Sequence, residues 1–111
     1  RTGVQASLRT AGEESLLTPE EAQALYRIAE EALSNIERHA NAQQVDVRLD
    51  CGADRIDLVI RDDGTGFDLA SVELERYGLT GMRERSAMIG ASVEVNSRPG
   101  GGTEVWCVLE R

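Results

Sequence analysis

The 111-residue sequence contains no lysine, and all 12 of its basic residues are arginine. A Walker-type phosphate loop needs a lysine that reaches the phosphates, so that class of nucleotide-binding protein is excluded. With one histidine, His39, and two cysteines outside any CxxC pair, the chain has too few soft ligands for a structural zinc site. Cys51 and Cys107 fall at apolar positions of predicted strands, so we expect buried free thiols rather than a disulfide.

Long apolar runs and a basic charge balance are also missing. No stretch approaches the roughly 18 apolar residues of a membrane span, and the N-terminus does not resemble a signal peptide. Acidic residues outnumber basic ones by 20 to 12, and the net charge of −8 would repel nucleic acid. We therefore expect one soluble domain over residues 1–111, part of a longer protein, in the reducing cytoplasm and without direct membrane contact.

The strongest helix signal begins at Thr18. Thr18 is suited to the N-cap, Pro19 to the first helical position, and Glu21 completes a capping box. An apolar stripe follows at helical spacing, formed by Leu25, Ala29, Ala32, Leu33 and Ile36. The pattern predicts a helix that runs to about His39 with this stripe buried.

Alternating apolar and polar residues predict the strands. The predicted strands cover residues 4–9, 44–51, 55–62, 92–97 and 103–110. A second helix is expected from about Gly81 to Ile89, with Gly90 as its stop. Strands that outnumber the helices but interleave with them favour an α+β fold. We expect a two-layer sandwich in which a mostly antiparallel mixed sheet carries the helices on one face.

Three polar residues lie at the edge of the apolar stripe on the first helix. Glu31, Asn35 and His39 are spaced by four, so in an α-helix they form one polar row along the rim of the core. A carboxylate and an amide oxygen in that place are suited to a hard cation such as Mg²⁺. The same row also fits an ordinary solvated helix face, and the row alone does not decide between the two.

Residues 62–66, Asp-Asp-Gly-Thr-Gly, directly follow a predicted strand. Asp62 could accept a hydrogen bond from the exocyclic amine of adenine, which guanine replaces by a carbonyl. Gly64 would let the backbone approach the ring, and Gly66 would start a flexible segment. Leu69 stands where a dinucleotide fingerprint has its third glycine, so that class is excluded. Alone, the motif also fits an ordinary Asp-Gly turn.

Two further segments contain glycines at predicted element boundaries. Residues 78–81, Gly-Leu-Thr-Gly, lead into the second helix, where unpaired amides and the helix dipole can bind an anion without lysine. Residues 98–102 form a glycine-rich turn before the last strand. Thr103, the residue after this turn, is a candidate binding residue only if its side chain faces the same pocket as Asp62. In isolation the first segment also fits a helix start without a ligand, and the second a plain hairpin.

In this order the four segments resemble the motifs of the GHKL ATPase superfamily, which uses the Bergerat fold. The run R-I-A-E-E-A-L-S-N-I-E-R-H-A from Arg27 and the run G-L-T-G-M-R-E-R from Gly78 are similar to histidine kinases of the nitrate-sensor and desaturase-regulator type. The resemblance extends from about Gly3 to Leu109. It implies the ATP-binding catalytic domain of a bacterial two-component sensor histidine kinase.

The resemblance also implies a role for each matching residue. Asn35 would bind Mg²⁺, and Glu31 would lie beside the ion as a candidate base. Arg38 and His39 would approach the phosphates of ATP, and Asp62 would recognise adenine. The other ATP-binding positions would be Gly64, Gly66, Phe67, Gly78, Leu79, Thr80, Gly81 and Thr103.

Residues 67–77 would form a short lid over the nucleotide. Two departures from the superfamily are visible. The lid has no separate phenylalanine-rich box, and the glycine motif at residues 78–81 contains only two glycines, Gly78 and Gly81.

The implied partners lie outside this chain. The γ-phosphoryl group of Mg-ATP would pass to a histidine on a separate helical dimerisation region and then to an aspartate of a response-regulator receiver domain. His39 falls inside the ATP motif, so it is not the expected acceptor. The parent protein would be a homodimer, whereas this chain alone would be monomeric.

Two other interpretations remain open at this stage. The first stays within the superfamily: an ATP-hydrolysing switch or an anti-sigma-type serine kinase. The second belongs to another class, a non-catalytic interaction module. Steady ATP turnover by the isolated chain would favour the switch, whereas transfer only to an added helical hairpin would favour the histidine kinase.

Overall fold

The computed structural model describes residues 5–66 and 79–111, except for the side chains of His39 and Ala40. The strands are β1 (Gln5–Gly12), β2 (Gln44–Cys51), β3 (Arg55–Asp62), β4 (Ser92–Ser97) and β5 (Thr103–Glu110). The helices are α1 (Pro19–Asn35) and α2 (Leu79–Met88), with a 3₁₀ turn η1 (Glu14–Leu16) before α1 and a π-helical turn η2 (Ile36–Ala40) after it.

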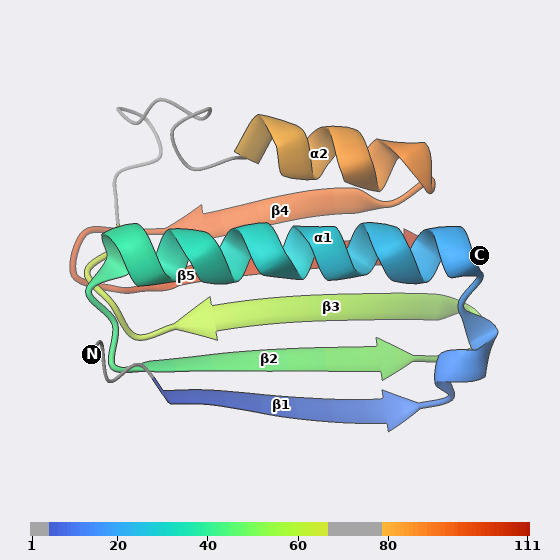
Figure 1. The fold of residues 1–111 in the computed structure, drawn as a ribbon, viewed down its shortest axis with the longest axis horizontal. Helices are drawn as coiled ribbons and strands as arrows, with labels where there is room; N and C mark the ends of the chain where they lie inside the picture. The colour runs from blue at the N-terminus through green and yellow to red at the C-terminus, as the bar shows by residue number, and fades with distance from the viewer. Residues whose placement is uncertain (1–4, 67–78) are drawn as a thin grey trace.

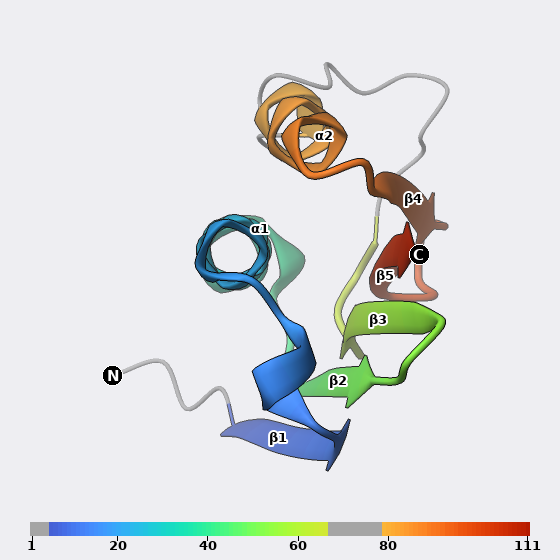
Figure 2. The same cartoon turned by 90° about the vertical axis from the view of Figure 1, so that its right-hand side faces the viewer.

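The described strands form one five-stranded sheet in the order β1-β2-β3-β5-β4 (Figure 1). β1 and β2 are parallel, and the other neighbouring pairs are antiparallel. Both α1 and α2 lie on the same face of this sheet (Figure 2). The expected two-layer α+β sandwich with a mixed, mostly antiparallel sheet is therefore confirmed.

Element boundaries agree with the sequence pattern from β2 to β5, where every strand begins and ends at the predicted residues. β1 is longer than predicted and continues to Gly12. Residues 10–12 also join the ladder, because β2 offers backbone partners along its whole length, up to the pair of Gly12 with Cys51. α2 begins at Leu79, two residues before the predicted start.

The capping box at the start of α1 is present as predicted. The Thr18 hydroxyl accepts a hydrogen bond from the Glu21 N–H at 3.1 Å, and the Glu21 carboxylate accepts one from the Thr18 N–H at 3.0 Å. The Thr18 N–H lowers the pKa of Glu21, and the Arg111 guanidinium, which pairs with Glu21, lowers it further. Arg111 also donates to the Leu16 carbonyl at 2.7 Å, so the end of the chain is bound to the start of α1.

One hydrophobic core fills the space between the helices and the sheet. Its largest fully buried side chains include Ile28, Ile56, Ile60, Met82 and Cys107. Cys51 and Cys107 are buried free thiols, as expected. Burial raises the pKa of both thiols, that of Cys107 to about 11. Across residues 5–66 and 79–111, no helix has the length and apolar character needed to cross a membrane.

β1 is exposed along its whole length. Leu8 pairs with Val47 in register and points to the core face, yet it is 69% exposed. α1 stands over the middle of the sheet, and β1 extends beyond it (Figure 2). The alternating pattern therefore identified a real strand, but helix packing decides which strands are covered.

The face of the sheet opposite the helices carries paired charges. Arg55 donates to Asp57 at 3.0 Å, the Trp106 indole N–H donates to the same carboxylate at 2.9 Å, and the Arg55 guanidinium lies 5.5 Å from the centre of the Trp106 ring. The further pairs on this face are Arg48 with Asp50 and Arg61 with Glu104. Exposed pairs contribute about 0–1 kcal/mol each, so this face is a charge-matched surface rather than a second packing layer.

We predict that Thr18→Ala lowers the free energy of unfolding by about 1 kcal/mol, because the Glu21 N–H loses its cap. Urea denaturation followed by circular dichroism measures the change. Thr10→Ala on exposed β1 is the matched control and should have a smaller effect. Equal losses in the two variants would contradict a specific contribution of the cap.

Candidate functional site

Four of the predicted segments approach one end of the sandwich. The C-terminal end of α1, the end of β3, the start of β5 and the start of α2 lie on the same side of the molecule (Figure 1). The sheet order brings β3 and β5 together although 40 residues separate them in sequence, and α2 lies beside α1 (Figure 2). Tertiary structure therefore groups motifs that are dispersed along the chain.

β3 ends in a buried carboxylate. Asp62 is 5% exposed, and its Oδ1 accepts a hydrogen bond from the Gly64 N–H at 2.7 Å. Its Oδ2 is buried and has no hydrogen-bond partner among the described residues. Leaving a buried polar atom unpaired costs about 1–3 kcal/mol. This oxygen therefore needs a donor that the described residues do not supply.

Burial raises the pKa of Asp62 above the ordinary range of an aspartate. The Gly64 and Thr103 N–H groups lower this pKa, and the charge of Asp63 raises it. Oδ2 nevertheless has no hydrogen-bond partner of normal geometry among the described residues. Burial has the largest effect, and a buried carboxylate with a perturbed pKa is typical of functional sites.

Thr103 and Ser97 extend this site across the sheet. Thr103 is directly opposite Asp62 in the β3–β5 pair, and Ser97 is directly opposite Thr103 in the β4–β5 pair. Directly opposite residues point to the same face, so the three polar side chains form a row on the core face. The Ser97 and Thr103 hydroxyl oxygens are hydrogen-bonded at 2.8 Å. Ser97 was not predicted, because its place depends on strand register rather than on a motif.

Two glycines allow the loop after β3 to pack against the turn between β4 and β5. Gly66 has a φ of 65°, and a Cβ at this position would overlap the carbonyl oxygens of Arg98 and Gly102. Gly102 has a φ of 73°, and a Cβ there would overlap the carbonyl oxygen of Asp62. The glycines of two separate motifs thus allow close backbone contact between the loop after β3 and the turn before β5. This contact lies beside Asp62.

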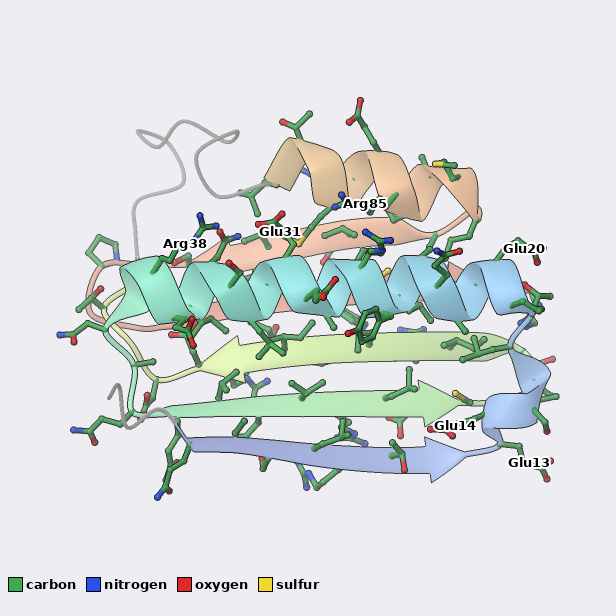
Figure 3. All side chains as sticks on the ribbon, viewed as in Figure 1. Glu13, Glu14, Glu20, Glu31, Arg38 and Arg85 are labelled. Atoms are coloured by element: carbon green, nitrogen blue, oxygen red, sulfur yellow. The ribbon has the colours of Figure 1, made fainter. Side chains whose placement is uncertain are left out.

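A second cluster lies at the C-terminal end of α1. Arg38 of η2 places its Nη2 3.6 Å from Glu31 Oε2 and 3.4 Å from Asn35 Oδ1. Figure 3 shows Glu31 and Arg38 on the side of α1 that faces α2. A guanidinium thus already lies against the carboxylate and amide oxygens that the sequence singled out for a cation. Two such oxygens fit Mg²⁺, which commonly takes one or two protein ligands and completes its shell with phosphate and water oxygens.

Among the residues that the structure describes, no group of three or more His, Cys, Asp or Glu side chains could hold a metal. A cation at Glu31 and Asn35 would therefore need ligand oxygens from a bound phosphate group.

The helix after Asn35 differs from the prediction. α1 ends at Asn35, and Ile36–Ala40 form a π-helical turn that ends at Asn41 in the left-handed region, with a φ of 50°. The polar row of spacing four therefore holds in α-helical geometry from Glu31 to Asn35 but not onward to His39. The wider turn redirects the residues that follow Asn35, and such turns often occur at functional sites.

Three of the predicted anion-binding residues, Leu79, Thr80 and Gly81, form the first turn of α2. Leu79 and Met82 are buried and fix α2 in the core, whereas Thr80 is exposed and Gly81 is partly exposed. The half-buried Arg85 side chain runs back along α2 beside Gly81. In Figure 3 Arg85 lies between α2 and the side of α1 that carries Glu31. Arg85 is the last residue of the run that begins at Gly78, but it was not predicted as a site residue.

The remaining predicted site residues are Phe67, Gly78, the lid over residues 67–77 and the side chain of His39, which all lie outside the described residues. The described ones form two clusters. One, on α1 and η2, offers oxygen ligands and a guanidinium; the other, on β3, β5 and β4, offers an unpaired carboxylate oxygen and two hydroxyls. This arrangement suits a ligand with a charged end and an end that donates a hydrogen bond.

A layered α+β domain with a polar helix rim and a glycine-flanked aspartate at a strand end has the organisation of a GHKL-type ATPase domain. The chain belongs to the family of histidine kinase-, DNA gyrase B-, and HSP90-like ATPases, whose model matches residues 20–111.

Its relatives are sensor kinases. The sensor histidine kinase LiaS of Bacillus subtilis is 42% identical over 81 residues, which are 73% of this chain and 22% of LiaS. The sensor protein VraS of Staphylococcus haemolyticus is also 42% identical over 81 residues, 73% of this chain and 23% of VraS. The histidine-protein kinase/phosphatase DegS of Bacillus subtilis is 34% identical over 94 residues, 82% of this chain and 24% of DegS. The chain thus spans less than a quarter of the length of these relatives.

Solved structures share the fold. A blue-light activated histidine kinase from Erythrobacter litoralis superimposes with a TM-score of 0.83 at 20% identity, covering 99% of this chain and 36% of that one. Full-length ShkA in complex with AMPPNP superimposes with a TM-score of 0.79 at 19% identity, covering 96% of this chain and 25% of that one. At this level of identity the likeness supports the fold alone.

We predict that the stability of the ligand-free chain, relative to Asp62→Asn, falls as pH rises. The raised pKa means that, between the unfolded-state pKa of about 4 and the pKa of the folded state, the folded protein binds more protons than the unfolded one. The free energy of unfolding must therefore decrease through that window. Urea denaturation of both proteins between pH 4 and pH 7 measures the difference, and a gap that is constant with pH would contradict the buried-carboxylate explanation.

Proposed function

We propose that this chain binds Mg-ATP and donates the γ-phosphoryl group to a histidine on a separate dimerisation region of its parent sensor kinase, which feeds a response regulator. The observation that carries the proposal is the buried Oδ2 of Asp62, which has no hydrogen-bond partner in the part of the chain that the structure describes. Family membership supports ATP binding, and the names of its relatives favour this function over a free-standing ATPase switch. The complex of ShkA with AMPPNP, an adenine nucleotide analogue, supports the choice of ligand.

Adenine would bind at the sheet end of the site. Its exocyclic amine would donate to Oδ2 of Asp62, supplying the hydrogen bond that this oxygen lacks. Guanine presents a carbonyl at the equivalent position, so two acceptors would face each other and the penalty would remain. Thr103, hydrogen-bonded to Ser97 on the same face, would orient the edge of the ring directly or through water.

The phosphates would bind at the helix end of the site. Asn35 would hold Mg²⁺ with Glu31 beside it, and the ion would supply charge neutralisation for the phosphate oxygens. Arg38, which lies against both oxygens in this structure, would turn its guanidinium to the phosphates. Arginine suits this task in a chain without lysine, because its planar fork can donate two parallel hydrogen bonds.

The chain's part in phosphoryl transfer would be positioning. Transfer requires the acceptor nitrogen in line with the bond that breaks, and the acceptor must approach from outside the site. The backbone of His39 is fixed in η2, four residues after Asn35, so this histidine would contact a phosphate rather than attack it. The acceptor would therefore come from the helical region of the parent protein.

We expect the purified chain to bind ATP in a Mg²⁺-dependent manner and to discriminate against GTP. Asp62→Asn should weaken ATP binding by about 1–3 kcal/mol while the fold is retained, the range for a hydrogen bond to a charged group. Isothermal titration calorimetry measures the affinities, with circular dichroism as the check on folding. Equal affinities for ATP and GTP would rule out the role of Asp62.

We also expect that the chain alone does not label itself with γ-phosphate, whereas its own helical region, added as a separate protein, becomes labelled. Radiolabelled ATP followed by acid and base treatment identifies phosphohistidine, and Asn35→Ala should abolish the transfer. Acid-labile phosphate on the isolated chain would make His39 the acceptor. Steady release of inorganic phosphate without transfer would instead favour the ATPase switch.

A further inference from the structure

Asp63 lies next to Asp62 in sequence but serves a different set of partners. Its Oδ1 accepts hydrogen bonds from two consecutive backbone N–H groups, Gln43 at 2.9 Å and Gln44 at 3.0 Å. In return the Asp63 N–H donates to the Gln44 carbonyl at 3.3 Å. The adjacent carboxylates are thus divided: Asp62 is buried with a free oxygen, and Asp63 is exposed and bound to the backbone of another segment.

The segment that Asp63 holds leads directly out of the helix end of the site. η2 ends at Ala40, and only residues 41–43 separate it from the first residue of β2. Within this link Asn41 is left-handed and Ala42 is buried in the core. The Gln43 carbonyl also accepts the Gln5 N–H at 2.9 Å, so the junction is held from β1 as well as from the end of β3.

The carboxylate form of Asp63 is favoured by this arrangement. The N–H groups of Gln44 and Gln43 lower the pKa of Asp63, so it is charged at neutral pH and accepts both hydrogen bonds. Charge-assisted bonds of this kind are about twice as strong as neutral ones. This anchor connects the strand end that carries Asp62 to the chain segment that follows Arg38.

We propose that Asp63 is a positioning residue that sets the spacing between the Glu31–Asn35–Arg38 cluster and Asp62. This inference rests on the proposed function, in which a nucleotide spans both clusters. A ligand with phosphates must contact both the Glu31–Asn35–Arg38 cluster and Asp62. Any motion of one relative to the other therefore has to be restricted on binding, which lowers the affinity. Adenosine engages the Asp62 end alone and is indifferent to the spacing. The role of Asp63 is therefore specific to adenine nucleotides that carry phosphates.

The test compares adenosine with Mg-ADP on four proteins: the unmodified chain, Asp63→Ala, Asp63→Asn and Asp54→Ala. Alanine removes both the Oδ1 acceptor and the charge, whereas asparagine removes the charge alone. A comparison of these two variants therefore separates the effect of the hydrogen bonds from that of the charge. Asp54 is an exposed carboxylate in the turn between β2 and β3, at the far end of the sheet, and is the matched control. Chemical-shift titration gives both affinities, and hydrogen exchange of the Gln43 and Gln44 amides reports on the anchor.

For Asp63→Ala we expect a loss of about tenfold in Mg-ADP affinity and a change within about twofold for adenosine, because only the spanning ligand depends on the preset spacing. The Gln43 and Gln44 amides should exchange faster in this variant. Asp63→Asn should restore part of the Mg-ADP affinity, because it keeps the acceptor without the charge, and Asp54→Ala should leave both affinities unchanged.

Three outcomes would overturn the inference while the proposed function stands: an equal loss for both ligands, unchanged Mg-ADP binding in Asp63→Ala, or no rescue by Asp63→Asn. Failure of the unmodified chain to bind either ligand would overturn the proposed function and this inference together.

Discussion

The packing of α1 against the core face of the sheet is the contact on which the other features depend. Ile28 and Ala32 are buried in this interface, and this fixes the rotation of the helix about its axis. Glu31 then lies on the side of α1 that faces α2 rather than exposed β1 (Figure 3). Asn35 belongs to the same cluster, because its Oδ1 lies 3.4 Å from Arg38 Nη2. The polar cluster at the end of α1 is therefore positioned by the apolar stripe, without a framework of its own.

The sheet end of the site is maintained at a cost to stability. A buried Asp62 oxygen without a partner among the described residues is unfavourable, and the burial of apolar side chains in the core offsets this cost. Two glycines near Asp62 also shape this end of the site. Gly66 and Gly102 adopt left-handed conformations that allow two backbone segments to approach closely, which shapes the surroundings of the carboxylate. The unpaired oxygen of Asp62 thus lowers the stability of the ligand-free chain, whereas it would favour binding of a ligand that donates a hydrogen bond.

Much of the fold was predictable because the relevant signals are local. Strand alternation located β2 through β5 to the residue, and the capping box located the start of α1. The π-helical turn after Asn35 was missed, because the helical periodicity of the sequence continues through it to His39. The exposure of β1 was not foreseeable either, since alternation reports two different faces but not whether a helix covers one of them.

By itself, the sequence determined the order of the elements, the residue types at each motif and the candidate chemistry of Asn35 and Asp62. Periodicity and motif spacing contain that information, because both act within a few residues. Only the tertiary structure decided which polar residues meet. Ser97 joins Thr103 and Asp62 through strand register, and Asp63 reaches Gln43 across 20 residues of chain. Such contacts follow from how strands pair and helices pack, which depends on the whole core at once and leaves no mark in local spacing.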